Sequence, residues 1–551
     1  MEAKKITAEK IYRDYQTGIS YNENIGLNKT VKDNENFFIG KQWEGVQSNG
    51  LPTPIFNFLK RVVLFQVASI LSDNIKIRAT PLSVSPAQRE LEQICDIISN
   101  EFEALFEYNE MGGLLREYVR NAAVDGDGCL YSYWDPETVT GQIEPGAIRT
   151  EVIENTRVFF GNPNERRVQC QPFITIMSRE WCEDVKERAK LNGVSSDQLE
   201  LIKPDSNEIN AELKGDDNRV TVLLRLWRDK KTKTIHAAES VRGVIIRPEW
   251  DLKIKLYPLV WLNWDYVQDS YHGQAMISGL IPNQIFVNKT YAMVQLSLMQ
   301  SAFPKYVYDK TRVNKWSNAV GAAIGVNGGD GDIATIIQPA QISPQISEFI
   351  RSTIEYTQTF LGATSVALGD TRPDNTSAIV ALQRASAVPS EMTKQSLYQS
   401  INQLGLIWLE FMREYYGIRE VKSPPIDFSG TPVEEQPNEK PTMPFNFASL
   451  SGVPMMIKLD VGAAAYWSEI ASMQTLDNLL MNGHIDIVDY LERMPAGYIS
   501  DKQKLIDTLK GKQISPQLPE SGIIPDQEAQ EIPLTAGNSA LQRKIVNASE
   551  L

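Results

Sequence analysis

The feature that most constrains the fold is a pair of helix-forming segments that bracket about forty residues without helical periodicity. The first segment begins near Leu280 and ends where Phe303 precedes Pro304, because the residue before a proline disfavours the α-helical region. The second begins with Ser343 as N-cap and Pro344 at the first helical position. These signals predict a long helical hairpin with a small insertion at its tip.

Apolar residues recur at three- and four-residue steps in both segments, so each helix is predicted to have an apolar stripe. The predicted stripes comprise Ile281, Ile285, Ala292, Leu296, Met299 and Phe303 in the first helix, and Ile346, Ile350, Ile354, Thr357 and Leu361 in the second. The first helix would span about 33 Å at 1.5 Å per residue. Its many polar residues argue against a membrane span, so we expect a soluble protein with no membrane partner.

A polar loop and a third, longer helix follow the hairpin. The loop region holds the segment "LGDTRPDNTSAIVALQRAS", residues 368–386, which has charge and a proline but no evident catalytic partner. The helix is predicted from Ser377 to Tyr416, with Gly417 as its stop. Pro389 removes a backbone hydrogen bond, so we predict a kink between Ala385 and Pro389. The apolar stripe of this helix comprises Leu397, Ile401, Leu404, Trp408 and Phe411.

The first 265 residues combine helices with short strands. After a polar N-terminal arm, apolar periodicity predicts a core helix near residues 58–70, with Leu64 on its apolar face, and a helical region over 87–124. A strand follows at 129–134, and strand-like runs separated by turn residues continue to about Asp265, with one helix at 179–193. This pattern predicts an α+β fold.

The C-terminal part begins with a proline-rich connector, after which residues from about 455 predict a strand followed by two short helices. The residues from about Lys512 are rich in Gln, Pro and Glu, and we expect them to be poorly ordered in isolation. The whole chain has 42% hydrophobic and 23% charged residues, as globular proteins do. Its net charge of -14 argues against a protein that binds nucleic acid over its whole surface.

No constellation of catalytic or metal-binding residues is evident. The glycine-rich "GVNGGDGD" at 325–332 lacks the lysine of a phosphate-binding loop, and "DGDG" at 125–128 lacks the calcium-loop pattern, so both are interpreted as turns. His236, His272 and His484 stand far apart and are interpreted as structural or exposed. The four cysteines form no C-x-x-C pair, and the polar start shows no signal peptide, so we expect reduced thiols. We therefore expect no enzyme, no cofactor and no metal.

The predicted insertion holds a basic cluster interleaved with aromatic residues. Its members are Lys305, Tyr306, Tyr308, Lys310, Arg312, Lys315 and Trp316. Such a cluster is compatible with a surface that faces nucleic acid or a protein partner, and equally with the solvated face of a small subdomain.

The order of these parts resembles that of the portal protein of tailed bacteriophages, the ring at one capsid vertex through which DNA passes. The stretches that carry the resemblance are "FFIGKQW", "AAVDGDGCLYSYWD", "GLIPNQIFVNKTYAMV", "LGDTRPDNTSAIVALQRAS" and "IKLDVGAAAYWSEIASMQTLDNLLMNGHIDIVDYLE". The resemblance implies a multi-domain α+β subunit that assembles into a ring. The implied parts are the wing (1–265), stem helix 1 (273–303), clip (304–343), stem helix 2 (344–362), tunnel loop (363–376), long kinked helix (377–417), proline-rich connector and wing return (418–454), crown (455–510) and a flexible polar tail (511–551).

The resemblance also implies a function. The ring, a dodecamer in this family, would conduct double-stranded DNA during packaging and ejection. The clip would dock the large terminase and later the head-tail adaptor proteins, and the wing would meet the major capsid protein and scaffold. The protein would be made in the host cytoplasm and act at the capsid vertex of the virion, with ATP hydrolysis left to the terminase.

The same resemblance assigns site residues. The DNA-facing residues of the tunnel loop would be Asp370, Thr371, Arg372, Asp374, Asn375 and Thr376, and the partner-facing residues of the clip would be Lys305, Tyr306, Lys310, Arg312, Lys315 and Trp316. Two alternatives stay open: another ring or scaffold component of a virion, and a metal-dependent enzyme that cleaves DNA or another polymer with carboxylates drawn from the 69 acidic residues.

Overall fold

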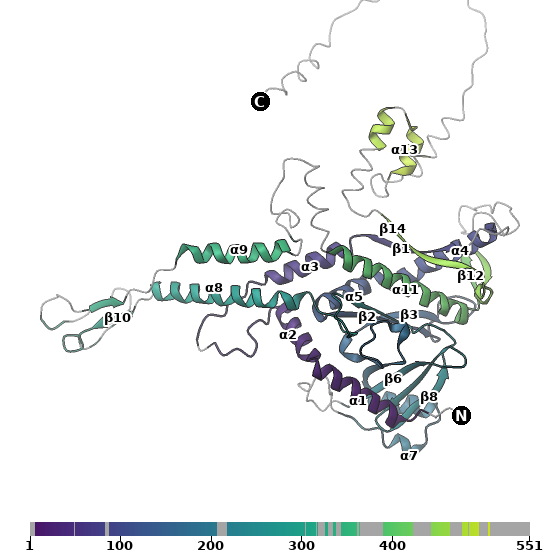
Figure 1. Ribbon diagram of the computed structural model, residues 1–551, viewed down its shortest axis with the longest axis horizontal. Helices are drawn as coiled ribbons and strands as arrows, with labels where there is room; N and C mark the ends of the chain where they lie inside the picture. The colour runs from purple at the N-terminus through teal and green to yellow at the C-terminus, as the bar shows by residue number, and fades with distance from the viewer. Residues whose placement is uncertain are drawn as a thin grey trace, which may run out of the picture. The chain divides into compact units, whose positions relative to one another are not determined.

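The computed structural model describes residues 6–48, 50–82, 88–205, 218–302, 305–313, 315, 317, 326–328, 334–337, 343–360, 363, 390–422, 442–462, 476–482, 484–494 and 505–506. The chain divides into two compact units, residues 1–467 and 468–551. Helices and antiparallel sheets occur together in the first unit, so the predicted α+β class is confirmed (Figure 1).

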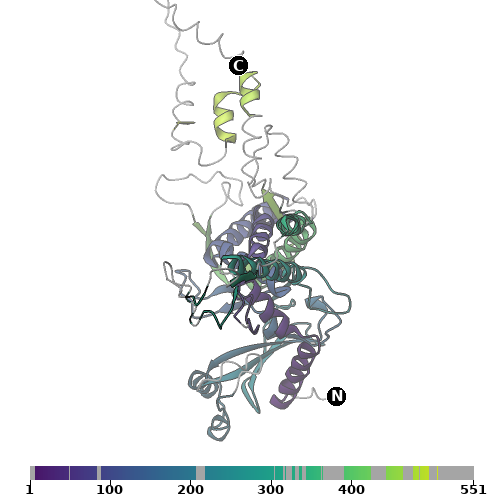
Figure 2. The same cartoon turned by 90° about the vertical axis from the view of Figure 1, so that its left-hand side faces the viewer.

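The N-terminal residues form two helices, α1 (Ala8–Asn24) and α2 (Leu27–Ile39), where we predicted a polar arm. Ile11, Tyr15 and Ile19 are buried at four-residue spacing and pack on the sheet residue Phe159. Figure 2 shows α1 alongside the strands of that sheet. The prediction was wrong because the charged residues between these positions mask a single narrow apolar stripe.

Two antiparallel sheets form the body of the first unit. The larger has five strands in sequential order, β4 (Val158–Phe160), β5 (Phe173–Trp181), β6 (Arg219–Arg228), β7 (Ile235–Val241) and β8 (Val244–Asp251). The smaller has the order β3 (Ala147–Ile153), β2 (Asp127–Asp135), β9 (Leu259–Asn263). The remaining elements of this region are α6 (Cys182–Leu191), α7 (Ser196–Leu199) and the 3-10 turns Asn155–Arg157, Val168–Cys170 and Ile277–Gly279.

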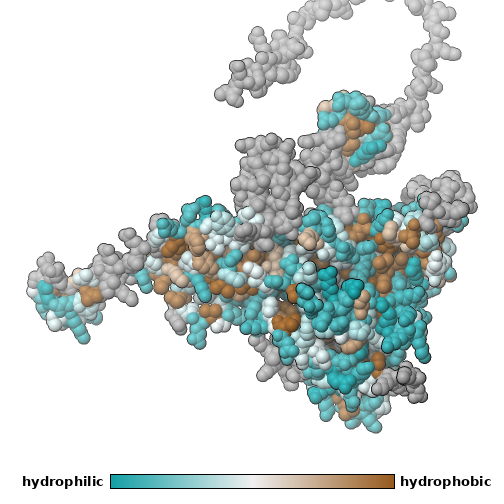
Figure 3. All heavy atoms as spheres, viewed as in Figure 1, coloured by the Kyte–Doolittle hydropathy of each residue, from teal (hydrophilic) through white to brown (hydrophobic). Residues whose placement is uncertain are grey.

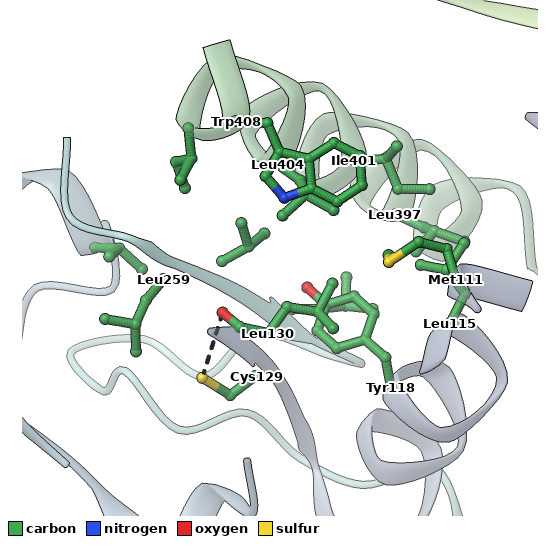
Figure 4. Close-up of a cluster of buried hydrophobic side chains, with 14 of the residues drawn as sticks. Met111, Leu115, Tyr118, Cys129, Leu130, Leu259, Leu397, Ile401, Leu404 and Trp408 are labelled. Atoms are coloured by element: carbon green, nitrogen blue, oxygen red, sulfur yellow. Dashed lines mark hydrogen bonds between the residues drawn. The ribbon is translucent and has the colours of Figure 1, made fainter. Parts of the chain in front are cut away.

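The main hydrophobic core lies between the smaller sheet and four helices, α3 (Phe58–Ile70), α4 (Gln88–Tyr108), α5 (Met111–Asp125) and α11 (Glu391–Tyr415). Figure 4 shows the stripe of α11 above Tyr118 of α5 and Leu130 of β2. All five residues predicted for this stripe are buried. The indole Nε1 of Trp408 donates to Ser132 and Thr150 of the sheet at 3.2 and 3.1 Å. Leu64 of α3, in contrast, is 48% exposed rather than in the core.

Two further two-stranded sheets belong to the first unit, and the first of them joins segments that are distant in sequence. β1 (Asn74–Pro81) pairs antiparallel with β14 (Met455–Gly462), and β12 (Ile418–Lys422) pairs with β13 (Thr442–Asn446), which a 3-10 turn at Phe447–Leu450 follows. β14 opens the range that the resemblance assigns to the crown, yet it pairs within the first unit. The connector residues 423–441 and the tail residues 507–551 lie outside the described residues.

The second unit contains a helical stretch at 476–481 and α13 (Ile487–Arg493), in agreement with the two short helices predicted there. Val488, Leu491, Met494 and Ile506 form its small core. The four cysteines are all free, and three of them are buried. No helix of the described residues is both long and apolar enough to cross a membrane.

Candidate functional site: the helical hairpin and its tip

The predicted hairpin is present. α8 (Ile281–Ala302) and α9 (Pro344–Phe360) lie side by side, and at the end of α8 a short antiparallel pair follows, β10 (Lys305–Tyr308) with β11 (Ala334–Ile337) (Figure 1). The predicted cap is confirmed, because the amide of Gln345 donates to Ser343 Oγ at 3.3 Å. Between the helices, the rings of Phe286 and Phe349 meet edge to face with their centroids 5.5 Å apart.

Buried amide side chains anchor the base of α8. Gln284 is 0% exposed, and its Nε2 donates to the carbonyl oxygen of Phe56 at 2.8 Å and to Asn288 Oδ1 at 2.9 Å. Asn288 Nδ2 in turn donates to Gln42 Oε1 at 2.6 Å. These bonds satisfy polar groups that would be costly to bury unpaired, and they fix α8 to the segment 42–57.

Sequence reasoning missed this anchor, because the amides of α8 counted only as evidence against a membrane span. Their spacing of four residues, which puts both on one face of a helix, is the signal that could have shown it. A second link joins the helices of the hairpin, where Asn283 Nδ2 donates to Thr357 Oγ1 at 3.0 Å and that hydroxyl donates to the Thr353 carbonyl oxygen at 2.7 Å.

The apolar stripe predicted for α8 is not a buried face. The buried residues of this helix are Gln284, Val287 and Asn288, and beyond Asn288 no described residue of α8 is buried. Ile281, Ile285, Ala292 and Leu296 are half-buried, Met299 is 51% exposed, and Phe303 lies outside the described residues. For α9 the prediction is better, since Ile350 and Thr357 are buried and Ile346 and Ile354 are half-buried, while Leu361 lies outside the described residues.

The hairpin therefore presents much apolar surface to solvent. The most exposed large apolar side chains are Met293 (67%), Leu298 (59%) and Met299 on α8, and Phe349 (60%) and Tyr356 (64%) on α9. Figure 3 shows this apolar surface along the hairpin. Contiguous exposed apolar patches of this kind mark interaction sites in soluble proteins.

The segment 43–56 adds two apolar hollows beside α8. One, of about 280 Å³, lies between Trp43, Leu51 and Met293, and the other, of about 580 Å³, lies between Pro54, Phe56 and Leu298. Phe56 stacks on Tyr291 with ring centroids 4.0 Å apart, so the segment follows the helix beyond the amide anchor.

The tip of the hairpin carries part of the predicted basic and aromatic cluster. Lys305 and Tyr306 lie in β10, Lys310 and Arg312 lie in the turn after it, Lys315 is exposed, and Trp316 lies outside the described residues. Asp309 orders the turn by accepting hydrogen bonds from the amide and hydroxyl of Thr311 at 2.8 and 2.5 Å, which lowers the pKa of its carboxyl group.

The predicted tunnel-loop residues Asp370, Thr371, Arg372, Asp374, Asn375 and Thr376 lie outside the described residues, and so do Pro389 and the predicted kink. The described part of the third helix ends at Tyr415, and Gly417 follows with a φ of +58°, in agreement with the predicted stop.

The turn "DGDG" belongs to a buried polar network. The carboxylate of Asp127 accepts hydrogen bonds at 2.7 Å from the Gly273 amide and from Asn263 Nδ2, and lies 2.7 Å from His272 Nδ1. His272 Nε2 lies 3.2 Å from Asn22 Oδ1 of α1. This network supports the structural interpretation of His272. No group of His, Cys, Asp and Glu within the described ranges is arranged to hold a metal ion.

Asp125, beside this network, is mostly buried near Arg120, whose NH1 lies 3.9 Å from its carboxylate. Desolvation raises the pKa of Asp125 to about 7, although the charge of Arg120 opposes the shift. Gly126 follows with a φ of +101°, and an added Cβ would come within 2.8 Å of the Gly273 carbonyl oxygen. In this turn the backbone at Gly126 therefore passes close to the backbone at Gly273, and the carboxylate of Asp127 accepts a hydrogen bond from the Gly273 amide.

Comparison with known proteins finds one family that matches part of the chain. Residues 173–421, from β5 to β12 and including the hairpin, match the family model described as "Phage P22-like portal protein". A search of the curated proteins finds no match. The family is structural, and its members are components of the virion. The match, over the segment that contains the hairpin, supports a phage portal protein.

Proposed function

We propose that the chain forms a closed ring, a dodecamer, at one vertex of the capsid, where it conducts double-stranded DNA during packaging and ejection. The observation that carries this proposal is the exposed apolar surface of α8 and α9. A heterologous contact repeated around a closed ring buries such a surface on every subunit and leaves no free end. Twelve copies of the 62.0 kDa chain would have a mass of about 744 kDa.

In this ring α8 and α9 are the two stem helices, and β10, β11 and the residues between them are the clip. The wing comprises the helices and sheets of residues 1–265, and the tunnel loop comprises 363–376. Because β14 pairs with β1, we begin the crown after β14, in the second compact unit, rather than at residue 455. The clip would dock the large terminase and the head-tail adaptors, and the wing would meet the capsid protein and scaffold.

The charge of the chain suits a conduit for DNA. A ring through which DNA slides needs contacts without a deep binding minimum, and each phosphate that a cation neutralises deepens that minimum. The net charge of -14, from 55 basic against 69 acidic residues, is compatible with such weak contacts. In the tunnel loop, Arg372 would meet phosphates while Asp370 and Asp374 repel them, and Thr371, Asn375 and Thr376 would offer weak, exchangeable hydrogen bonds.

The ring proposal can be tested at Met293 and Leu298, one beside each apolar hollow. Burying a side chain of this kind stabilises a contact by about 1.5–3 kcal/mol, and the double variant Met293→Lys/Leu298→Lys removes that contribution at every interface. The matched control is Val139→Lys/Leu191→Lys, at positions 87% and 83% exposed outside the hairpin.

Negative-stain electron microscopy and mass photometry would measure assembly. We expect rings from the wild type and the control variant, and monomers with an unchanged circular dichroism spectrum from the hairpin variant. Rings of normal mass from the hairpin variant would overturn the assignment of this surface to the subunit interface. Nuclease activity of the wild type on plasmid DNA with divalent metal would instead support the enzyme alternative.

A further inference from the structure

A groove that none of the functions above uses runs between β1 and α4. It encloses about 630 Å³ and is lined along one side by Asn74–Arg78 of β1. The buried side chains Phe102 and Met111 contribute to its floor. We call it the β1 groove. Unlike the hollows beside α8, it follows the edge of a strand.

β1 pairs with β14 on one side. On its other side lies α4, and within the part of the chain that the structure describes no strand pairs with that edge. The amide of Ala79 donates to Ser99 Oγ of α4 at 3.0 Å, so it points away from β14. In an antiparallel pair every second residue points its amide and carbonyl outward, which sets those of Ile75 and Ile77 toward the groove. An unpaired edge of this kind is a template for another strand.

The charged residues that line the groove form its rim, and their charges do not balance. Lys76 pairs with Glu103 at 2.5 Å, and Arg78 pairs with Asp460 of β14 at 3.0 Å. The further charged residues that line the groove are three carboxylates, those of Asp96, Glu107 and Glu110, against one amine, that of Lys422. All four are exposed. The groove therefore combines a strand edge that pairs with no strand of the described residues, an apolar floor and an acidic rim.

We propose that the β1 groove binds an extended segment of a partner polypeptide, which adds to β1 as a third strand and alternates apolar with basic residues. Main-chain hydrogen bonds to Ile75 and Ile77 would supply the pairing, as in other proteins that bind peptides by strand addition. Asn74–Arg78 offers about 16 Å of edge at 3.3 Å per residue. The apolar side chains of the segment would face the floor, and its lysines or arginines would meet the carboxylates of the rim.

The probe is a short synthetic peptide of alternating lysine and valine, added to the full-length protein at saturating concentration. Hydrogen exchange of the stretch Asn74–Pro81, followed by mass spectrometry with fragmentation, reports the edge amides. We expect the amides of Ile75 and Ile77 to exchange at least about tenfold more slowly with the peptide. The control peptide has the same sequence with N-methylated valines, which cannot donate to the edge, and should give no protection.

The rim is tested by Glu107→Lys/Glu110→Lys, with the exposed Glu117→Lys of α5 as the matched control. The rim variant should lose the protection and the control should keep it. Equal protection of the edge amides by the N-methylated peptide would overturn strand addition. Unchanged binding of the peptide to the rim variant would overturn the charge argument. Strong protection of Ile75 and Ile77 before any peptide is added would show that the edge is already paired within the chain, and would overturn the proposal.

Discussion

The amide anchor at the base of α8 makes a sharp prediction for Asn288→Ala. The substitution removes the donor to Gln42 Oε1 and the acceptor for both Gln284 Nε2 and the Phe56 amide, in a site where Asn288 is 3% and Gln42 7% exposed. Gln284 Nε2 keeps the Phe56 carbonyl oxygen, whereas Gln42 Oε1 is left buried without that donor. Losing these bonds and stranding one acceptor costs about 2–4 kcal/mol.

Hydrogen exchange measures this cost locally, because opening of the segment 42–57 from α8 exposes its amides. A loss of about 2–4 kcal/mol should speed exchange of protected amides in this segment by roughly thirtyfold to several hundredfold. The matched control is Asn283→Ala, which removes one half-buried bond to Thr357, and we expect an effect of about 1 kcal/mol on α9 and none on 42–57.

Two outcomes would refute this reasoning. Exchange over 42–57 that stays within about twofold of the wild type in Asn288→Ala would show that the apolar contacts alone hold the segment. An equal effect of Asn283→Ala on 42–57 would show that α8 and the segment open together as one unit, so that the buried amides have no separate role.

Three further predictions concern the body of the first unit. Trp408→Phe should lower the free energy of unfolding by about 1–3 kcal/mol in urea, since Ser132 loses a buried donor. Asp125→Asn should stabilise the protein more at pH 8 than at pH 4. Because the pKa of Asp125 is raised in the folded state, the wild type loses stability as pH rises from about 4 to about 7, and the asparagine variant does not. Equal gains in the free energy of unfolding at both pH values would contradict the raised pKa. Gly128→Ala should prevent folding or lower the melting temperature strongly, because its Cβ would lie 2.5 Å from the Tyr118 carbonyl oxygen; a normal thermal transition would refute this.

The sequence predicts best where one helix carries its own periodic signal. The stripe of α11 and the Ser343 cap are both as predicted, because each depends on residues within a few turns of one another. The burial on α8 could not be predicted in the same way. Its buried face consists of amides whose partners, Gln42 and Phe56, lie more than 200 residues earlier in the chain.

The N-terminal helices show a different limit. Ile11, Tyr15 and Ile19 form the centre of a narrow apolar face on α1, set among charged residues, so polar composition outweighed periodicity in the prediction. In the candidate site, local signals in the sequence predicted the hairpin and the basic residues near its tip. They did not predict that Met293 and Leu298 would be exposed. Apolar residues at helical spacing predict a face that needs a partner, and they do not say whether that partner is the same chain or another one.

The pairing of β1 with β14 also decides when the first unit can be completed during synthesis. The two strands are separated by about 380 residues of chain, so at about 5–20 residues per second β14 leaves the ribosome some 20–75 s after β1. During that interval β1 has neither edge paired, and its apolar residues Ile75 and Ile77 are open to any other nascent strand. Subunits made side by side on one message are therefore vulnerable to mispairing at this strand, and a chaperone that covers it would have to act until β14 is made, after the hairpin is complete.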